Sequence, residues 1–571
     1  MTTPKAVRVV TEVSAVDKSF DYAITPATQH VGLGDRVRVN FNGRSVRGWV
    51  SEFVEPEREL KELVKWLGYG PPPELTPLLA WAARRWVAPV SRFYLATSPP
   101  RIITDLPTPP KKIGLTDVLR ELEVPLVPGV TRVAPSVDPL GIVLHAYETS
   151  RHREGSLLVL VPTEGWAQRL RGRLAQRGLA VACGDGEWDR MRASWPIIIG
   201  TRGDAFAPTP RLCAAVVIDA DDSAFRSEAS PTYHATEVVL HRAQLDEAPV
   251  WLCSALPSPA LLGGSETCAV ARDEVAGWPA ISVIDRRGTD PRDGVLSSEV
   301  LDAVHHALRG GEEVAVAIVL QRLGTGRLFG CRSCGDLARC EICAAPEAEA
   351  GSRVTCPNGH GERESFCRSC GSTQLKKIRS GVTTLARDVT LQLGQAVDEV
   401  TATTKNSPLT ARVVVGTEAI FSRVRRCSLV VFVDFDQYLL APRERARREG
   451  ILAVAKAGRL VGARSEGRGS VMLQTRRGDD KVLQSLVAVD LTPIQVQDVI
   501  DARELEIPPF VARAEISGES AAAFVASITA SSVAITSVDE GFTVTAATHE
   551  ELSTALLAAV RPPGRLRLAI E

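Results

Sequence analysis

Three cysteine pairs, each with two residues between its members, lie close together in this sequence. They are Cys331 with Cys334, Cys340 with Cys343, and Cys367 with Cys370. This spacing lets both thiolates of a pair face one ion, and Zn²⁺ accepts four such ligands in a tetrahedron with Zn–S distances of about 2.3 Å. We therefore predict a zinc-binding segment. The alternatives are a set of buried free thiols, or a single zinc beside spectator cysteines.

With Cys356, the segment contains seven cysteines. Two sites of four ligands each need eight, so one ligand is missing. His360 follows four residues later and could supply the missing ligand through an imidazole nitrogen. A site closed by four protein ligands has no open position for water, so these sites would be structural and not catalytic. In a cytosolic chain, clustered cysteine pairs favour metal over disulfides.

Composition excludes several classes of function. The chain has 571 residues, of which 44% are apolar and 24% charged, and its 67 basic and 68 acidic side chains give a net charge of −1. These fractions are typical of a folded soluble protein of about four domains. A chain with so little net charge does not bind nucleic acid through its overall charge. Any DNA binding must therefore come from local clusters of basic residues. Because the chain has neither an apolar run of about 18 residues nor a signal-like N-terminus, we expect a cytoplasmic protein without a membrane partner.

The first hundred residues predict a small barrel or open sheet. β-Branched and aromatic stretches occur at residues 7–13, 36–41 and 45–53, and turn residues separate them. Residues 75–87 show the helical spacing of apolar side chains. Residues 101–138 are rich in proline and are typical of a linker.

Two series of buried strands and helices follow. Continuous apolar runs that alternate with helical stretches indicate parallel sheets with both faces covered. The runs of the first series lie at 156–162, 196–200, 214–219 and 250–254, and those of the second at 313–320, 411–416, 429–434 and 470–474. We therefore predict two α/β lobes at 139–270 and 271–490, with the cysteine segment inserted in the second. An α+β domain is predicted at 491–571.

Several stretches resemble the primosomal protein N′ (PriA) family of replication restart helicases. The N-terminal match consists of Phe20-Asp21-Tyr22 and of residues 34–39. Residues 199–208 resemble the family segment IGTRSALFAP, 231–235 resemble PRYHAR, and 254–258 resemble SATPS. Residues 415–417 and 457–459 are similar to the late helicase motifs. The order and spacing of these pieces, from about residue 6 to the C-terminus, make the resemblance specific.

The resemblance implies a fold and two ligand sets. It implies a 3′-end DNA-binding domain at 1–100, two RecA-like lobes, and a zinc module at 329–372. In the family the outer cysteine pairs share one zinc and the middle pairs share the other. Carried over by position, the first set is Cys331, Cys334, Cys367 and Cys370, and the second is Cys340, Cys343 and Cys356, with His360 in place of the family's next cysteine. The family's winged-helix domain has no counterpart in the short stretch 101–138.

The resemblance also implies DNA contacts. Positions that line the family's pocket for the terminal base and 3′-hydroxyl match Phe20, Asp21, Tyr22 and Gly34, and Arg36 belongs to the same stretch. An aromatic ring can stack on a base, and a carboxylate can accept a hydrogen bond from a sugar hydroxyl. The alternative is that Phe20 and Tyr22 pack the barrel, since alternate residues of a strand share one face.

Three elements of the family's ATPase chemistry are missing. A P-loop needs a Gly-Lys pair, but residues 138–143 read DPLGIV and no lysine occurs between Lys112 and Lys376. The carboxylate that would orient the attacking water is replaced by Ala220, and the last motif lacks its second arginine after Arg459. Asp219 and Arg459 remain as remnants of a nucleotide site. We predict no catalytic residue and no productive ATP binding, with weak nucleotide binding as the alternative.

These observations predict a replication restart protein without helicase activity of its own. It would bind stalled forks and D-loops, hold two zinc ions, and work at the nucleoid in the cytoplasm. By resemblance, its partners are the single-stranded DNA-binding protein and the replicative helicase or its loader. Two alternatives stay open: an active ATP-dependent 3′–5′ DNA helicase, and a zinc-ribbon interaction scaffold that does not bind DNA.

Overall fold

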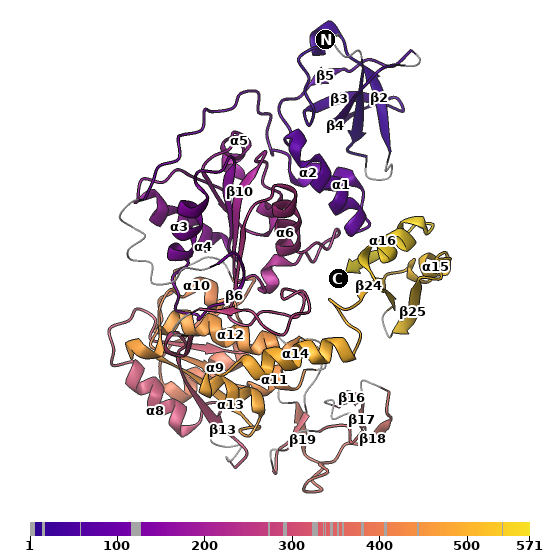
Figure 1. Cartoon of the computed structure of the whole chain (residues 1–571). Helices are drawn as coiled ribbons and strands as arrows, with labels where there is room; N and C mark the ends of the chain where they lie inside the picture. Colours follow the sequence, from indigo (N-terminus) through magenta and orange to yellow (C-terminus); the bar gives the residue numbers. More distant parts are fainter. Residues whose placement is uncertain are drawn as a thin grey trace. The chain divides into compact units, whose positions relative to one another are not determined.

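The computed structural model describes residues 6–571 apart from short internal stretches. Those stretches are 14–17, 57–58, 116–126, 272–273, 289–293, 322–328, 335, 337, 343–346, 351–352, 357–358, 378–381, 405–407, 442, 444 and 539–540. The described chain forms two compact units, shown in Figure 1. The first contains residues up to 132, 138–269 and 495–571, and the second contains 133–137 and 270–494.

The N-terminal part of the first unit is an antiparallel sheet. Its strands are β1 (Ala6–Thr11), β2 (Ser19–Ala23), β3 (Arg36–Phe41), β4 (Arg44–Val54) and β5 (Lys65–Trp66), in the order β2-β1-β4-β3-β5. The end of β2 is hydrogen-bonded to the segment before β5. The Ala23 N–H donates to the Lys61 carbonyl, and the Leu63 N–H donates to the Ala23 carbonyl. This closure confirms the barrel-like character. Helices α1 (Thr76–Arg85) and α2 (Val90–Ala96) follow.

The first lobe is a parallel sheet that lies in the same unit. Its strands β6 (Gly129–Arg132), β7 (Ser156–Leu160), β8 (Val181–Cys183), β9 (Ile197–Gly200), β10 (Leu212–Ile218) and β11 (Val250–Ser254) follow the order β6-β11-β10-β7-β9-β8. Strands β7, β9 and β10 are buried throughout, as expected for a sheet covered on both faces. The principal helices are α3 (Pro139–Ser150), α4 (Glu164–Ala175), α5 (Trp188–Arg192) and α6 (Ala235–Leu245).

The predicted linker at 101–138 differs from the structure in one respect. Strand β6 lies inside it and pairs in parallel with β11, so the linker contributes a strand to the first lobe. Four residues between proline-containing stretches are too few to show a periodic pattern. Residues 101–115 contain no helix or strand.

The second lobe is a parallel sheet in the second unit. Its strands β13 (Ala280–Asp285), β14 (Val316–Val319), β20 (Asp398–Val400), β21 (Val413–Gly416), β22 (Leu429–Phe432) and β23 (Ser470–Thr475) follow the order β13-β23-β22-β14-β21-β20. Its helices include α8 (Ser298–Ala307), α9 (Val382–Leu393), α10 (Ile420–Arg423), α11 (Asp436–Leu439), α12 (Ala446–Val461) and α13 (Lys481–Ala488). Two parallel lobes with the cysteine segment between β14 and β20 confirm the predicted fold class.

The C-terminal part is a small α+β sheet. Helix α14 (Thr492–Glu504) leads into β24 (Ala512–Ser517), α15 (Ala521–Ala526), β25 (Val533–Val538), β26 (Gly541–Ala546), α16 (His549–Ala558) and β27 (Arg567–Ile570). The strands are antiparallel in the order β25-β26-β24-β27. Across the described ranges, no helix has the length and apolar character that a membrane crossing requires.

A buried charge cluster joins three parts of the first unit. Arg85 of α1 forms an ion pair with Glu237 of α6, and its Nη2 lies 3.2 Å from Nε2 of His549 in α16. Burial and the positive charge of Arg85 lower the pKa of His549 to about 4. His549 is therefore neutral at neutral pH, and protonation would place two cations side by side.

This cluster predicts a loss of stability in mild acid. The unfolded chain has an ordinary histidine pKa near 6.5, so between about pH 4 and 6.5 it binds more protons than the folded chain at this residue. The free energy of unfolding should therefore fall as the pH decreases through this window. We expect His549→Gln to reduce that slope in melting temperatures measured across the window, whereas exposed His305→Gln leaves it unchanged. An unchanged slope in His549→Gln would contradict the assignment.

Candidate metal centres and nucleic-acid interface

The first cysteine group is assembled by a two-stranded sheet. Strand β15 (Phe329–Cys331) pairs antiparallel with β19 (Leu375–Lys377), and Cys331 lies opposite Leu375. This pairing brings the 331–334 turn to the 367–370 turn, and a hydrogen bond of 2.9 Å joins Ser333 Oγ to Ser372 Oγ. The outer cysteine pairs therefore meet although more than thirty residues separate them.

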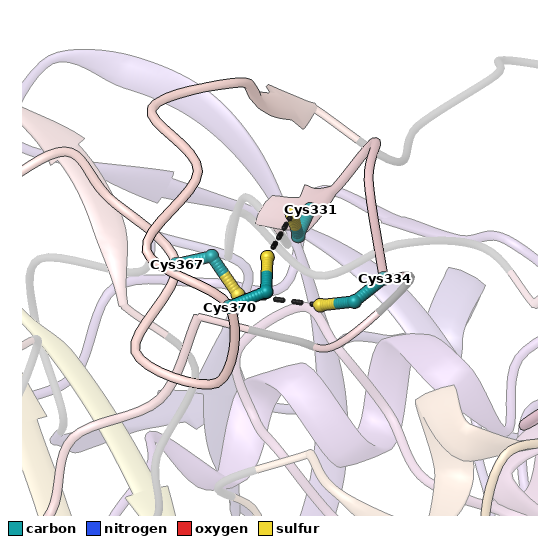
Figure 2. A group of neighbouring side chains, drawn as sticks. All are labelled: Cys331, Cys334, Cys367 and Cys370. Atoms are coloured by element: carbon teal, nitrogen blue, oxygen red, sulfur yellow. Dashed lines mark hydrogen bonds between the residues drawn. The ribbon is translucent and has the colours of Figure 1, made fainter.

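Four sulfur atoms converge between these turns (Figure 2). The Sγ atoms of Cys331 and Cys370 are 3.5 Å apart, and those of Cys334 and Cys367 are 3.4 Å apart. A disulfide needs about 2.05 Å. A zinc tetrahedron with bonds of about 2.3 Å places its sulfurs about 3.8 Å apart. The arrangement therefore fits a bound ion and not a disulfide.

Backbone amides favour the thiolate form at this group. The Ser333 N–H donates to Cys331 Sγ at 3.3 Å. Burial opposes ionisation of Cys331, but the N–H groups of Cys334 and Ser333, together with hydrogen bonds from the Cys370 and Cys367 thiols, outweigh it and lower the pKa of Cys331 to about 6. The pKa values of Cys334 and Cys370 are raised, so the thiolate is favoured at Cys331 in particular. Since the thiolate is the metal ligand, the turn prepares the site for a cation.

A hairpin carries the second group. Strands β16 (Ala348–Ala350), β17 (Arg353–Thr355) and β18 (Glu362–Glu364) form a small antiparallel sheet. Cys356 directly follows β17, and His360 lies in the turn before β18, which is closed by a bond from the Cys356 N–H to the Gly361 carbonyl. The tight turn uses a positive φ at Gly361.

His360 reaches both described cysteines of this group. Its Nδ1 lies 3.6 Å from Cys356 Sγ and 3.7 Å from Cys340 Sγ. Bonds of about 2.0 Å to nitrogen and 2.3 Å to sulfur place these atoms about 3.5 Å apart in a tetrahedron. The predicted fourth ligand, Cys343, lies outside the described residues. The chain thus contains two groups that could hold metal ions, and the structure brings His360 to the position expected of a ligand.

An ion pair that the sequence did not reveal supports both groups. Arg363 of β18 bonds to Glu347 at 2.9 Å, and its Nη1 donates to the carbonyl of Phe366, the residue before Cys367. Glu347 is 3% exposed, and its N–H donates to the Ala338 carbonyl. Removal of one partner of such a buried pair costs about 3–5 kcal/mol. No periodic pattern or motif marks a single Glu–Arg pair, so sequence reasoning had no signal for it.

The N-terminal aromatic residues have packing roles. Tyr22 is 3% exposed and lies in the barrel core with Val9, Val37 and Val50. Phe20 is partly buried against the same core, and its ring contacts that of Phe41 with centroids 4.9 Å apart. The shared face expected for alternate strand residues is therefore present. Contact of Phe20 with DNA stays a prediction.

Gly34 and Arg36 are covered by the protein itself. A Cβ atom at Gly34 would lie 1.9 Å from the Pro71 carbonyl oxygen, so the close approach of residues 70–72 requires glycine here. Arg36 is 8% exposed and donates to the carbonyls of Pro99 and Arg101. Burial lowers the pKa of its guanidinium. These two residues shape the domain, and the structure gives neither one an open face for DNA.

Asp21 lies on the opposite, solvent-facing side of β2. Its carboxylate accepts a hydrogen bond of 2.9 Å from Arg8, and Arg8 also pairs with Glu52 of the neighbouring strand β4. About a third of the Asp21 side chain remains exposed. Of the five predicted DNA contacts, Asp21 is the polar group that the structure leaves accessible.

A carboxylate occupies the N-terminus of helix α3, where a P-loop would bind phosphate. Asp138 caps the helix by accepting from the Leu140 N–H at 3.0 Å, and Arg173 of α4 donates to the same carboxylate at 2.8 Å. Burial opposes its ionisation, but Arg173 and the Leu140 N–H outweigh that effect and lower the pKa of Asp138. Pro139 at the first helical position offers no N–H.

The second helicase motif is used for local structure. Ala220 is 1% exposed, its N–H donates to the Cys253 carbonyl, and its carbonyl accepts from Thr236 Oγ1. Asp221 accepts from the Ser258 N–H and Asp222 from the Ala224 N–H. Asp219 follows strand β10 with a positive φ, and Arg459 lies in the last turn of α12. Asp222 therefore caps its own loop, whereas Asp221 ties this loop to the one after β11.

The two cysteine groups lead to a prediction of zinc content. Elemental analysis of the purified protein should give about two zinc ions per chain, because each tetrahedral group holds one ion. We expect His360→Ala to lower the content to about one, and Cys331→Ser to remove the other ion. Exposed His305→Ala is the matched control and should retain both. A wild-type content of one zinc would contradict the second site.

Comparison with known proteins gives a match to one domain family. Residues 8–99 match the 3′DNA-binding domain (3′BD) of PriA. This range contains the barrel except for the first two residues of β1, and both following helices α1 and α2.

Relatives that match two thirds or more of the chain, or close to it, carry the same name. A probable replication restart protein PriA of Mycobacterium leprae is 26% identical over 599 residues, which covers 89% of this chain and 86% of that protein. The probable replication restart protein PriA of Mycobacterium tuberculosis strain H37Rv is 29% identical to this chain. The aligned region covers 67% of this chain and 65% of that protein. The replication restart protein PriA of Bacillus subtilis is 24% identical to this chain. The aligned region covers 65% of this chain and half the length of that protein. The domain match and these relatives together support membership of the PriA family.

Proposed function

We propose that this protein recognises branched DNA at stalled forks and D-loops and helps reload the replicative helicase, without unwinding DNA itself. The match of residues 8–99 to the 3′ DNA-binding domain supports DNA binding. The name of the relatives supports a role in replication restart. Such a role places the protein in the cytoplasm at the nucleoid.

The Asp138 cap carries the proposal that ATP is not used. The N–H groups at a helix N-terminus attract anions, and P-loop proteins use them to hold the phosphates of a nucleotide. Here a carboxylate of the chain takes that position and is fixed by Arg173. A triphosphate would have to displace this carboxylate, without a P-loop lysine to attract it.

The second motif supports the same conclusion. The carboxylate that orients the attacking water would have to replace the side chain of Ala220, which is buried in an apolar core. Asp221 accepts from the Ser258 N–H in the loop after β11, and Asp222 accepts from the Ala224 N–H in its own loop, so both carboxylates are engaged with backbone amides. Loss of a phosphate-stabilising arginine lowers rates by about 10³–10⁵, and the last motif lacks one after Arg459.

We assign the cysteine groups to two structural zinc ions. The first group has four converging thiols, and the second would have four ligands if Cys343 joins Cys340, Cys356 and His360, so neither ion would keep a coordination position for water chemistry. The zinc module and the lobes would then present surfaces to the single-stranded DNA-binding protein and to the replicative helicase or its loader.

ATP turnover tests the absence of motor activity. We expect hydrolysis by the wild-type protein to stay at background with and without forked DNA, because phosphate binding and water activation are both impaired. Asp219→Ala serves as the control, since hydrolysis that survives this change comes from a contaminant. DNA-stimulated hydrolysis that Asp219→Ala abolishes would reject the proposal in favour of an active helicase.

Fluorescence anisotropy tests recognition of the 3′ end. A fork with a free leading-strand 3′-hydroxyl should bind more tightly than blunt duplex. Asp21→Asn should weaken fork binding by about tenfold, because it removes one charged hydrogen-bond acceptor.

Glu52→Gln is the matched control for Asp21→Asn. Both carboxylates bind Arg8, so equal losses would mean that the effect acts through Arg8 and not through a DNA contact. Equal affinity of the wild-type protein for forks and blunt duplex would support the zinc-ribbon scaffold without DNA binding.

A further inference from the structure

Three basic side chains form a row across the outer face of the N-terminal barrel. Strands β5, β3 and β4 are neighbours in its sheet (Figure 1). Their registers place Lys65 opposite Arg38, and Arg38 opposite Arg47. All three residues are exposed, whereas Val37 and Val39 on either side of Arg38 lie in the barrel core. We call these three residues the basic row.

The basic row does not favour the folded domain by itself. Like charges directly opposite each other on paired strands destabilise a sheet. Arg47 has a counter-ion, since its Nε and Nη2 donate to Glu12 at 2.5 and 2.6 Å. Among the described residues, the side chains of Arg38 and Lys65 form no hydrogen bond and no ion pair. Burial lowers the pKa of Arg36, the preceding outward residue of β3, and the charge of Arg47 lowers it further. An anionic partner would relieve this repulsion.

We propose that the basic row binds the phosphate backbone of a duplex arm of the DNA, apart from any contact to the 3′ end. This inference rests on the proposed function, because it requires a protein that binds branched DNA. Residues 8–99, which contain the row, match a 3′DNA-binding domain. Neighbouring strands lie about 4.8 Å apart, so the row spans about 10 Å. Duplex DNA carries one phosphate charge per about 1.7 Å of its axis, so each cation of the row can meet a phosphate.

The basic row is separate from Asp21, the accessible polar residue of the predicted 3′-end contacts. Asp21 lies opposite Arg8 on the paired strands, and Arg8 lies opposite Glu52. Glu52 and Arg47 both belong to β4, five positions apart, which is about 15 Å along an extended strand. The two groups can therefore contact different parts of one DNA molecule.

The surroundings of the basic row suit phosphate oxygens. The next outward pair on β3 and β4 is Asn40 with Ser45, and both residues are exposed and polar. Amide and hydroxyl groups donate to phosphate oxygens in protein–DNA complexes, whereas protein interfaces are enriched in aromatic side chains. If the row instead bound an acidic protein partner, the affinity for duplex DNA would not depend on it.

Duplex binding by the full zinc-loaded protein at several salt concentrations tests the row. Each phosphate contact contributes about 0.9 to the slope of log affinity against log salt concentration. Arg38→Gln and Lys65→Gln should therefore each lower the slope for blunt duplex by about 0.9. If affinities converge at about 1 M salt, each variant then binds about eightfold more weakly at about 0.1 M. Arg38→Lys keeps the charge and should keep the slope.

The matched control is Arg84→Gln, which removes an exposed charge from helix α1 of the same domain and should leave the slope unchanged. The melting temperature without DNA gives a second readout. Arg38→Gln removes the repulsion from β4 and β5, so its melting temperature at low salt should rise by about one degree. A lower melting temperature would mean that Arg38 supports the fold, and it would contradict the repulsion on which the inference depends.

The salt test and the fork test can fail separately. A preference for forks together with unchanged slopes in Arg38→Gln and Lys65→Gln overturns the basic row alone. Lower slopes in both variants without a fork preference support the row and reject recognition of the 3′ end. An equal loss of slope in Arg84→Gln also overturns the row, because the effect then follows overall charge. So does a wild-type protein that binds no duplex at low salt.

Discussion

Amide groups at the start of a buried helix need an electron-rich partner, and in this chain the partner of helix α3 is internal. The Asp138 carboxylate accepts from the Leu140 N–H and is held in place by Arg173 on the next helix. The first lobe thereby completes its own polar contacts where related architectures rely on a bound phosphate. A lobe satisfied in this way can be stable without a nucleotide, and its conformation need not follow a cycle of binding and hydrolysis.

The first lobe then has a second use, as a support for its neighbours. Arg85 links α1 to α6 and to α16, and Thr232 and Arg226 fix the last strand of the C-terminal sheet. The DNA-binding barrel, the lobe and the C-terminal sheet form one unit through such contacts. These contacts give the lobe a structural role that does not depend on nucleotide chemistry.

The central strands of the two lobes could be predicted because a strand that is buried on both faces consists almost entirely of apolar residues. Eight lobe strands lie close to the predicted stretches, namely β7, β9, β10, β11, β14, β21, β22 and β23, whereas β8, β13 and β20 were not predicted. Strand β6 was missed because four residues carry no period. The cysteine spacing predicted a metal-binding segment and the family resemblance divided it into the two groups, and a histidine four residues after Cys356 was sufficient to suggest His360. Burial of Gly34 under Pro71 and the capture of Arg36 by two carbonyls depend on segments distant in sequence, so no local pattern indicated them.

If His360 ligates a zinc ion as proposed, it changes the redox chemistry of its centre. An imidazole is neutral, so a zinc ion held by three thiolates and His360 carries one negative charge less than one held by four thiolates. It also has one sulfur fewer to be attacked by peroxide, and an imidazole cannot join a disulfide. In a cell under oxidative stress, the centre of Cys331, Cys334, Cys367 and Cys370 is therefore the one expected to release its ion first, while the hairpin around Cys356 keeps its fold.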